Sequence, residues 1–435
     1  MKIKKILNNY KLCVNCILIK YFWHLKIKCM KRSISKLFGL SMLVLSSQLV
    51  RAQSDTVKSI VKSEETTKSN WYDNIQIRGY LQVRYNRLLE TNPDLKCEQC
   101  DKSWGENGGF FIRRARMIFS GQISKRVYFY VQPDFASSAG TTGHIVQLRD
   151  AYFDLGLDKD NQFRIRLGQS KVPYGFENMQ SSQNRLPLDR NDALNSAVSN
   201  ERDLGAFFYW APKTTRSLYS SLVKDGLKGS GDYGVFAFGA YNGQTANQFE
   251  RNDNLHIVSR LSYPIKIKNQ IIEPGIQAYS GKVVLLSTSS GVKKNDDSEY
   301  LDQRAAASFI LYPKPFGIQA EYNIGKGPEY NKYTDSIEVQ DLKGGYITMS
   351  YMLKFGKQTL IPFVRGQYYE GGKKHELDAR SYKVNEYEIG LEWQPHKTFE
   401  LVVMYTISHR RFEDHAKPDN FQSGNLLRLQ AQINF

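Results

Sequence analysis

Apolar and polar residues alternate along many short segments of this chain. In residues 75–85 (IQIRGYLQVRY), the odd positions are mainly apolar and the even positions carry Gln, Arg or Tyr. The same period of two recurs in residues 127–135, 163–167 and 387–393. Because successive side chains of a strand point to opposite faces, this period predicts β-strands with one apolar and one polar face.

Weaker alternation, separated by turn residues, extends this pattern along the chain. The weaker segments are 110–120, 145–155, 233–242, 255–263, 316–323, 346–351 and 360–369. In total we count about 17 candidate strands. If the sheet crosses a membrane with both chain ends on one side, the number is even. We therefore predict sixteen strands, with eighteen as the alternative.

The end of the chain is itself a candidate strand. Residues 428–435 (RLQAQINF) alternate up to the terminal Phe435, although chain ends usually fray. A closed barrel explains this, because its last strand must pair with its first to leave no open edge in lipid. The terminal Phe435 also resembles the assembly signal of Gram-negative outer-membrane barrels, which implies the barrel assembly machinery as a partner.

A soluble β-sandwich would show the same local alternation, so the choice of fold depends on global features. An export leader, the terminal strand and 27 Tyr, 23 Phe and 5 Trp, which suit interfacial girdles, favour a membrane barrel. No stretch after residue 52 offers the ~20 apolar residues of a membrane helix. We predict an all-β protein: a transmembrane antiparallel β-barrel of about 16 strands over residues 75–435.

The positive charge of the chain is concentrated in its first part. Residues 1–52 hold eleven Lys and Arg and no acidic residue, so the formal charge of +17 falls to +6 beyond residue 52. This weakens the case for nucleic-acid binding. A basic stretch from Met30, an apolar stretch and the small Ala52 predict a signal peptide cleaved after Ala52. We expect translation to start at Met30, with a long basic region from Met1 as the alternative, and residues 53–74 to form a short periplasmic lead.

Few residues indicate chemistry. Cys97 and Cys100 form a CxxC pair, for which a loop disulfide or an incidental pair is favoured over a redox centre in an exported chain. Without a second CxxC or a nearby His pair, the sequence predicts no zinc site, and we expect no metal and no cofactor. The chain carries no GxSxG, HExxH or Walker motif, so we expect no enzyme.

Several segments together resemble the phosphate-selective porin O/P family. They are FFIRRARMIFSG (110–121), QLRDAYFDL (147–155), RIRLGQSKVPYGFE (164–177), NRLPLDR (184–190), RDLGAFFYW (202–210), YGVFAFGAYNG (233–243) and IPFVRGQYY (361–369). The resemblance implies a 16-stranded channel in the outer membrane of a Gram-negative bacterium, usually trimeric, that passes anions. The CEQC loop and residues 282–300 look like local insertions.

Nine arginines occupy the polar parity of the predicted strands and are candidates for an anion path through the lumen. They are Arg78, Arg84, Arg114, Arg116, Arg164, Arg166, Arg260, Arg365 and Arg428. Arginine stays protonated and presents a planar fork to phosphate or carboxylate oxygens. The alternative is that these arginines pair with acids on the same face, among them Glu388, Glu392, Asp134, Asp150 and Asp154.

Residues 171–175 (KVPYG) end a predicted strand and open a long segment that runs to about residue 200. In the family, the corresponding loop folds into the barrel and narrows it. By that resemblance Lys171, Arg185 and Arg190 are candidates for the constriction. The alternative is a loop that lies outside the pore.

Our leading hypothesis is an outer-membrane porin for passive diffusion of small anions. The resemblance adds phosphate as a solute, a homotrimer, and outer-membrane lipid as the surroundings. The alternatives are a non-conducting structural or adhesion barrel and an outer-membrane barrel enzyme.

Overall fold

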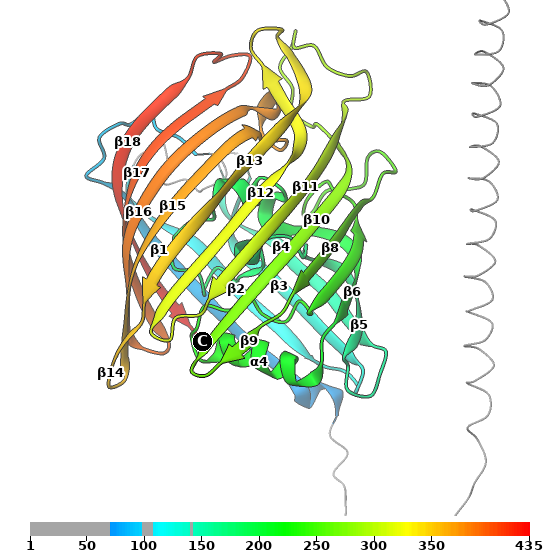
Figure 1. Cartoon of the computed structure of the whole chain (residues 1–435), viewed down its shortest axis with the longest axis vertical. Helices are drawn as coiled ribbons and strands as arrows, with labels where there is room; N and C mark the ends of the chain where they lie inside the picture. Colours follow the sequence, from blue (N-terminus) through cyan, green and yellow to red (C-terminus); the bar gives the residue numbers. More distant parts are fainter. Residues whose placement is uncertain (1–69, 98–107, 140–141) are drawn as a thin grey trace, which may run out of the picture. The chain divides into compact units, whose positions relative to one another are not determined.

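In the part of the chain that the structure describes, the strands form one antiparallel barrel. The computed structural model describes residues 70–97, 108–139 and 142–435. Eighteen strands form a single sheet that closes where β1 (Ile75–Leu88) pairs with β18 (Phe421–Asn434) (Figure 1). The leader predicted for residues 1–52, the cleavage after Ala52 and most of the predicted lead lie outside the described residues, so they stay predictions.

The other strands follow each other around the wall. They are β2 (Phe110–Gln122), β3 (Val127–Ala139), β4 (Thr142–Gly156), β5 (Phe163–Lys171), β6 (Arg202–Trp210), β7 (Phe236–Tyr241), β8 (His256–Ser262), β9 (Ile265–Ile267), β10 (Gln270–Val284), β11 (Glu299–Leu311), β12 (Phe316–Asn331), β13 (Ser336–Tyr351), β14 (Leu353–Phe355), β15 (Gln358–Gly372), β16 (Ser381–His396) and β17 (Phe399–Glu413).

Two of these strands are short continuations of the strands before them. β9 pairs with β10, as β8 does, and β14 pairs with β15, as β13 does. The wall therefore has sixteen strands, which confirms the predicted all-β, antiparallel, 16-stranded barrel. Among the described helices, none is long and apolar enough to span a bilayer.

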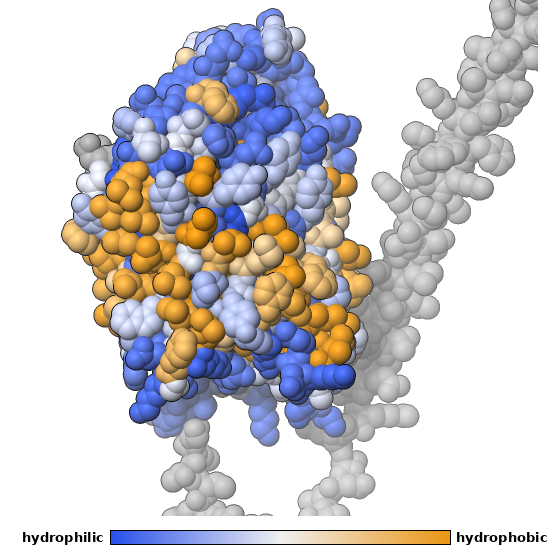
Figure 2. Space-filling view, turned by 60° about the vertical axis from the view of Figure 1, so that its left-hand side comes forward, coloured by the Kyte–Doolittle hydropathy of each residue, from blue (hydrophilic) through white to orange (hydrophobic). Residues whose placement is uncertain are grey.

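The period of two separates the two faces of the wall. In β1, Gln82 and Arg84 are buried in the lumen, whereas Leu81 and Val83 are only half-buried on the outside. On the face that Figure 2 shows, apolar side chains form a band across the middle of the barrel, with hydrophilic surface above and below. A band of this kind is the lipid-facing surface of a membrane barrel.

The lumen is less polar and more filled than the alternation alone predicts. Two clusters of buried apolar side chains lie within the barrel, around Tyr174 and Leu194 in one and around Phe176 and Leu222 in the other. They form because two segments enter the lumen and bury their own apolar side chains against the wall. The segment after β5 is the larger one, and the connection between β6 and β7 is the other.

The connection between β6 and β7 carries the longest helix, α4 (Lys213–Lys224), at the end of the barrel where the C-terminus lies (Figure 1). Tyr219 and Leu222 are its buried apolar residues that face the second cluster. Lys228, which follows the helix, forms an ion pair of 2.5 Å with Glu392 of β16. The connection is thus fixed to the opposite wall. The remaining short helices are η1 (Trp71–Asn74), α2 (Phe176–Met179), α3 (Asp192–Asn195), η2 (Ser199–Glu201) and η3 (Leu377–Ala379).

The terminal Phe435 closes the barrel against Gly79 of β1. The Gly79 nitrogen donates to the Phe435 oxygen at 2.7 Å, and the Phe435 nitrogen donates back to the Gly79 oxygen at 3.0 Å. A Cβ atom on residue 79 would lie 2.5 Å from the Arg116 carbonyl oxygen and 2.7 Å from the Phe435 ring. Glycine is therefore the residue that lets the chain end pack here.

Gly79→Val is expected to destabilise closure of the barrel by about 1–3 kcal/mol, because the added side chain overlaps backbone that cannot move freely. The temperature at which the folded band converts to the unfolded band on a gel should fall. The matched control is Gly366→Val in β15, where an added Cβ meets only the Tyr387 ring, at 3.6 Å. An unchanged conversion temperature for Gly79→Val would contradict this role of Gly79.

Candidate functional site

Residues 172–201, which we call the inward segment, connect β5 to β6 through the lumen. Pro173 cannot donate to the sheet, and Gly175 has a φ of 84°, which glycine adopts at no steric cost. The strand ends here, and the backbone nitrogens of Phe176 and Glu177 donate to the Glu321 carboxylate of β12 at 2.6 and 3.0 Å. The predicted inward-folding loop is therefore present, and the alternative of a loop outside the pore is wrong.

Ion pairs anchor the inward segment to the wall. Asp189 contacts Arg84 of β1 at 3.1 Å and also binds Arg428 of β18. Glu177 contacts Arg365 of β15 at 3.1 Å. All of these side chains are buried.

A third anchor lies further along the segment. Asp192 contacts Arg410 of β17 at 2.9 Å and also binds Lys373. Arg410 is not one of the nine candidate arginines. Three of the nine, Arg84, Arg365 and Arg428, contact the inward segment and hold it in place.

Four more of the nine candidate arginines have carboxylate partners on the wall or near it. The pairs are Arg116–Asp134 (2.6 Å), Arg166–Asp154 (2.7 Å), Arg260–Glu273 (3.1 Å) and Arg164–Asp232 (2.8 Å). Seven of the nine candidate arginines are therefore paired with acids. For these seven, the structure supports the alternative of ion pairing and not an anion path of unpaired cations. Arg78 is exposed near the C-terminal end of the barrel, with its guanidinium 5.9 Å from the centre of the Tyr130 ring.

The acids that the sequence predicted as partners also form ion pairs, and all but one of them pair with an arginine. Glu388 contacts Arg365 at 2.6 Å, and Asp150 contacts Arg202 at 2.9 Å. Glu392, however, pairs with a lysine, Lys228, rather than with an arginine.

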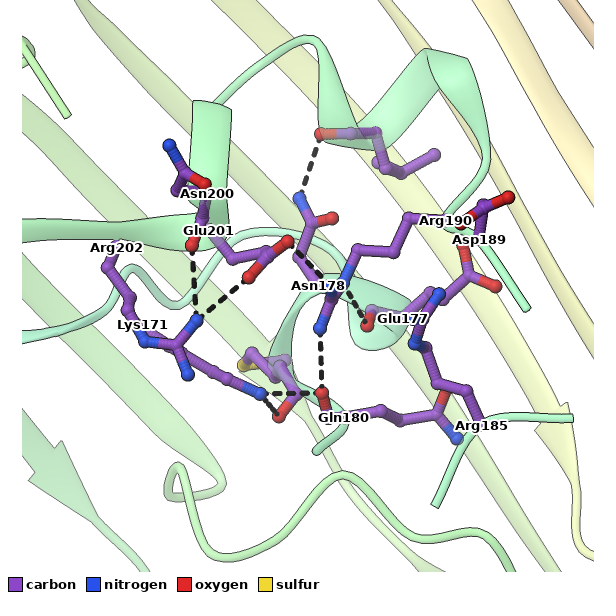
Figure 3. Close-up of polar contacts among 12 residues, drawn as sticks. Lys171, Glu177, Asn178, Gln180, Arg185, Asp189, Arg190, Asn200, Glu201 and Arg202 are labelled. Atoms are coloured by element: carbon purple, nitrogen blue, oxygen red, sulfur yellow. Dashed lines mark hydrogen bonds and ion pairs between the residues drawn. The ribbon is translucent and has the colours of Figure 1, made fainter. Parts of the chain in front are cut away.

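Four buried cations form no ion pair with a carboxylate of the described residues; we call Arg114, Arg149, Lys171 and Arg185 the cation cluster. Lys171 donates to the carbonyl oxygens of Met179 and Gln180 at 2.8 and 2.5 Å. Arg185 donates to the Leu188 carbonyl oxygen at 3.2 Å. Figure 3 shows Lys171 and Arg185 on either side of Gln180.

The two other members lie on the neighbouring wall. Arg114 donates to Gln82 at 2.8 Å, and Arg149 donates to Asn200 at 3.3 Å. The Nε atoms of Arg114, Arg149 and Arg185 have no hydrogen-bond partner within the described part of the chain. The cluster therefore holds positive charge and free donors that its surroundings do not use.

The third constriction candidate, Arg190, lies beside the cation cluster but is paired. Its guanidinium contacts Glu201 at 2.6 Å and donates to the Gln180 carbonyl oxygen at 3.0 Å (Figure 3). Arg202 contacts the same Glu201 at 2.8 Å. The structure thus brings Lys171, Arg185 and Arg190 together around Gln180. The carboxylate next to them is that of Glu201, which Arg190 shares with Arg202.

The charged side chains of the inward segment differ in how well neighbouring charges balance them. Burial alone would raise the pKa of the Asp192 carboxyl, but Arg410 and Lys373 outweigh it and lower this pKa to about 2. Burial, together with the neighbouring Arg190, lowers the pKa of Arg185 to about 9. Asp192 is therefore a charged anchor at neutral pH, whereas Arg185 lacks an adequate counter-charge.

The inward segment is expected to stay docked from neutral pH down to about pH 4 and to loosen between about pH 4 and pH 2. The folded-state pKa of Asp192 lies below the ordinary value of about 4, so its stabilisation is complete above that value and is lost as the pH falls through about 2. Channel conductance measured against pH should rise over that interval, and less so in Asp192→Asn. A rise already complete at about pH 6 would contradict this anchor.

A cavity of about 1250 Å³ lies at the C-terminal end of the barrel, and its lining is basic. Among its lining residues are Arg78, Lys224, Lys228, Lys314, Lys354, Lys357 and Lys397, against the acids Asp225 and Glu400. The entrance at this end therefore carries a positive surface.

The sequence matches the family of phosphate-selective porins O and P over residues 94–435. The chain belongs to this family. Membership indicates a porin, a channel protein rather than an enzyme, with an outer-membrane location. No curated protein sequence matches the chain.

Solved structures of other porins share the fold of this family member. The outer-membrane channel DcaP of Acinetobacter baumannii is similar with a TM-score of 0.52 and 12% identity, covering 83% of this chain and 97% of that one. OmpF of Salmonella typhi, solved with daunomycin, is similar with a TM-score of 0.50 and 12% identity, covering 83% and 98%. At these identities the likeness establishes the barrel fold and nothing more.

Sequence reasoning missed several residues of the porin lumen. Arg149 lies at odd parity beside Asp150, yet both are buried, because a register shift between β3 and β4 lets both face inward. Arg410 alternates with the outward His409 and Arg411 and could have been found from that pattern. Asp189 and Asp192 gave no sequence signal, because their partners are distant in the chain.

The cysteine prediction is only partly covered by the described residues. Cys97 is disulfide-bonded and packs against Leu95 and Leu426. Cys100 lies outside the described residues, so its pairing with Cys97 stays a prediction.

Proposed function

We propose that this porin passes small anions by passive diffusion through the lumen beside the inward segment. The observation that supports this most strongly is the cation cluster. The buried carboxylates of the inward segment are neutralised by arginine and lysine, whereas Arg114, Arg149, Lys171 and Arg185 form no ion pair with an acid in the described part of the chain. A mobile anion is the natural counter-charge for such a group.

The contacts available to that anion are weak and repeated. The spare guanidinium donors of Arg114, Arg149 and Arg185 can bind oxygens or halide ions. Lys171 adds a compact ammonium group, which the carbonyl oxygens of Met179 and Gln180 hold in place. Conduction requires binding sites that an ion enters easily and also leaves easily. Several cations on different elements meet this requirement better than one tight site.

We further propose phosphate as one of the solutes. Its several oxygens can form two parallel hydrogen bonds with one guanidinium and also accept from another cation, whereas a monatomic anion presents a single acceptor atom to all donors. The family description, phosphate-selective porin, supports the same solute. We also propose that the protein forms a homotrimer in a Gram-negative outer membrane, after insertion by the barrel assembly machinery.

Uptake into proteoliposomes tests this proposal. Protein extracted from membranes is reconstituted, and entry of chloride and phosphate is compared with entry of small organic cations of similar size. We expect both anions to enter at least severalfold faster than the cations. Equal rates for anions and cations, or no uptake by folded protein, would contradict the proposed function.

A further inference from the structure

A row of charged side chains crosses the outward face of the wall at the end opposite the C-terminus. Lys343 of β13, Glu370 of β15, Lys383 of β16 and Arg411 of β17 pair directly in register. Glu370 lies 3.7 Å from Lys343 and 3.4 Å from Lys383, and Arg411 lies 3.5 Å from Glu413. The lysine side chains are 57% and 46% exposed. We call Lys343, Lys383 and Arg411 the cation row.

An apolar groove of about 560 Å³ lies next to this row, one step nearer the middle of the barrel. Its floor is low because Gly345 and Gly366 have no side chains and Ala307 has a small one. Tyr322 and Tyr387 are among the aromatic residues that flank it. The groove runs across strands β11, β12, β13, β15 and β16, which lie side by side in the wall (Figure 1).

The register connects the groove to the cation row. Lys343 is two residues from Gly345 on β13, and Lys383 is four residues from Tyr387 on β16, so each pair shares one face. Two residues along a strand span about 7 Å. A ligand with a hydrocarbon chain in the groove would therefore place its headgroup on the cation row.

A polar hollow of about 550 Å³ continues the surface on the other side of the row. Its lining includes Lys343 and Arg411 together with carboxylates, amides and hydroxyls, among them Asp341, Gln340 and Tyr333. Mixed donors and acceptors of this kind suit the hydroxyl groups of a sugar. The three parts thus match a hydrocarbon chain, an anionic group and a sugar, in that order along the strands.

We propose that this surface binds one molecule of a phosphorylated, acylated glycolipid of the outer leaflet. One acyl chain lies in the groove, a phosphate accepts from the cation row, and the sugar occupies the hollow. The exposed ion pairs with Glu370 are weak, so Lys343 and Lys383 can re-pair with phosphate, which binds cations more strongly. Long connections lie at this end, such as residues 285–298 between β10 and β11, whereas residues 312–315 between β11 and β12 form a short one at the other end. The long-loop end of a barrel faces the outside, which places this surface in the outer leaflet.

Native mass spectrometry of the extracted, delipidated protein tests the proposal. The probes are diphosphorylated hexa-acylated lipid A, the same lipid without phosphates, and phosphatidylglycerol, which has the negative charge but no sugar. We expect one lipid A per chain, bound at least tenfold more tightly than either other lipid. Equal binding of the three probes would overturn the proposal.

Two variants and one control separate the parts of the surface. Lys343→Gln/Lys383→Gln/Arg411→Gln should weaken lipid A binding at least tenfold. Gly366→Val should place a side chain in the groove and weaken binding similarly. The wall can accept this side chain, because an added Cβ meets only the Tyr387 ring, at 3.6 Å. Lys266→Gln/Lys268→Gln, at the opposite end of the barrel, should change nothing.

Unchanged lipid A binding in the triple variant and in Gly366→Val would overturn the proposal. A changed number of subunits in these variants, with lipid A binding unchanged, would also overturn the proposal. The groove would then be a contact between copies of the chain.

Discussion

The double substitution Lys171→Gln/Arg185→Gln is expected to lower the preference of the channel for chloride over potassium about threefold to tenfold. Both cations are buried in the lumen without an ion-paired carboxylate among the described residues. A charge that is poorly screened acts on a passing ion by more than 1 kcal/mol at contact distances, and about 1.4 kcal/mol corresponds to tenfold. Glutamine keeps a donor at both positions, removes the charge and has a shorter side chain.

The measurement is the reversal potential across a salt gradient in a planar bilayer. Lys171→Arg is the conservative variant, which should retain most of the anion preference. Lys266→Gln/Lys268→Gln removes two exposed charges at the barrel end and should leave the reversal potential nearly unchanged. An unchanged reversal potential in Lys171→Gln/Arg185→Gln would exclude these two cations as the source of selectivity.

Asp189→Asn is expected to release part of the inward segment and to raise the single-channel conductance at least twofold. The substitution leaves the buried Arg84 and Arg428 without the carboxylate that both contact. Removing one partner of a buried ion pair costs about 3–5 kcal/mol, although Arg428 keeps a second carboxylate, that of Glu388, at 3.8 Å. Moving the segment lets water reach both arginines, so this rearrangement costs less than keeping the segment docked.

Single-channel conductance, together with limited proteolysis in the segment, measures this release. Asp160→Asn is the matched control, because Asp160 pairs at 3.1 Å with Lys213, whose side chain is 74% exposed, so that the pair contributes little. Conductance equal to wild type in Asp189→Asn, with the folded barrel intact, would show that Asp189 does not hold the segment in the lumen.

The period of two predicted the wall strands, because each of them must separate a lipid face from a lumen face, whereas the leader, the terminal strand and the aromatic content favoured a barrel over a sandwich. It failed where one extra residue enters a strand. Arg113 lies opposite a register shift between β1 and β2, and Arg149 opposite one between β3 and β4. One residue of slip changes the face of a side chain, and the alternation itself does not mark where this happens.

The candidate site was predictable only in part. Parity placed Arg84, Arg365 and Arg428 in the lumen, but their partners come from a segment far away in the chain; Asp189 follows Arg84 by 105 residues. Contacts at such a separation depend on how the inward segment folds, which no local pattern records. Lys171 and Arg185 were found because the resemblance marked this segment as a constriction.

The most direct test of the central claim is a single-channel recording of the extracted wild-type protein across a salt gradient, with phosphate then titrated against chloride. The account predicts a reversal potential of the sign for anion selectivity and a chloride current that falls as phosphate occupies the cation cluster. A reversal potential of the opposite sign, or no conductance from protein shown to be folded, would contradict it.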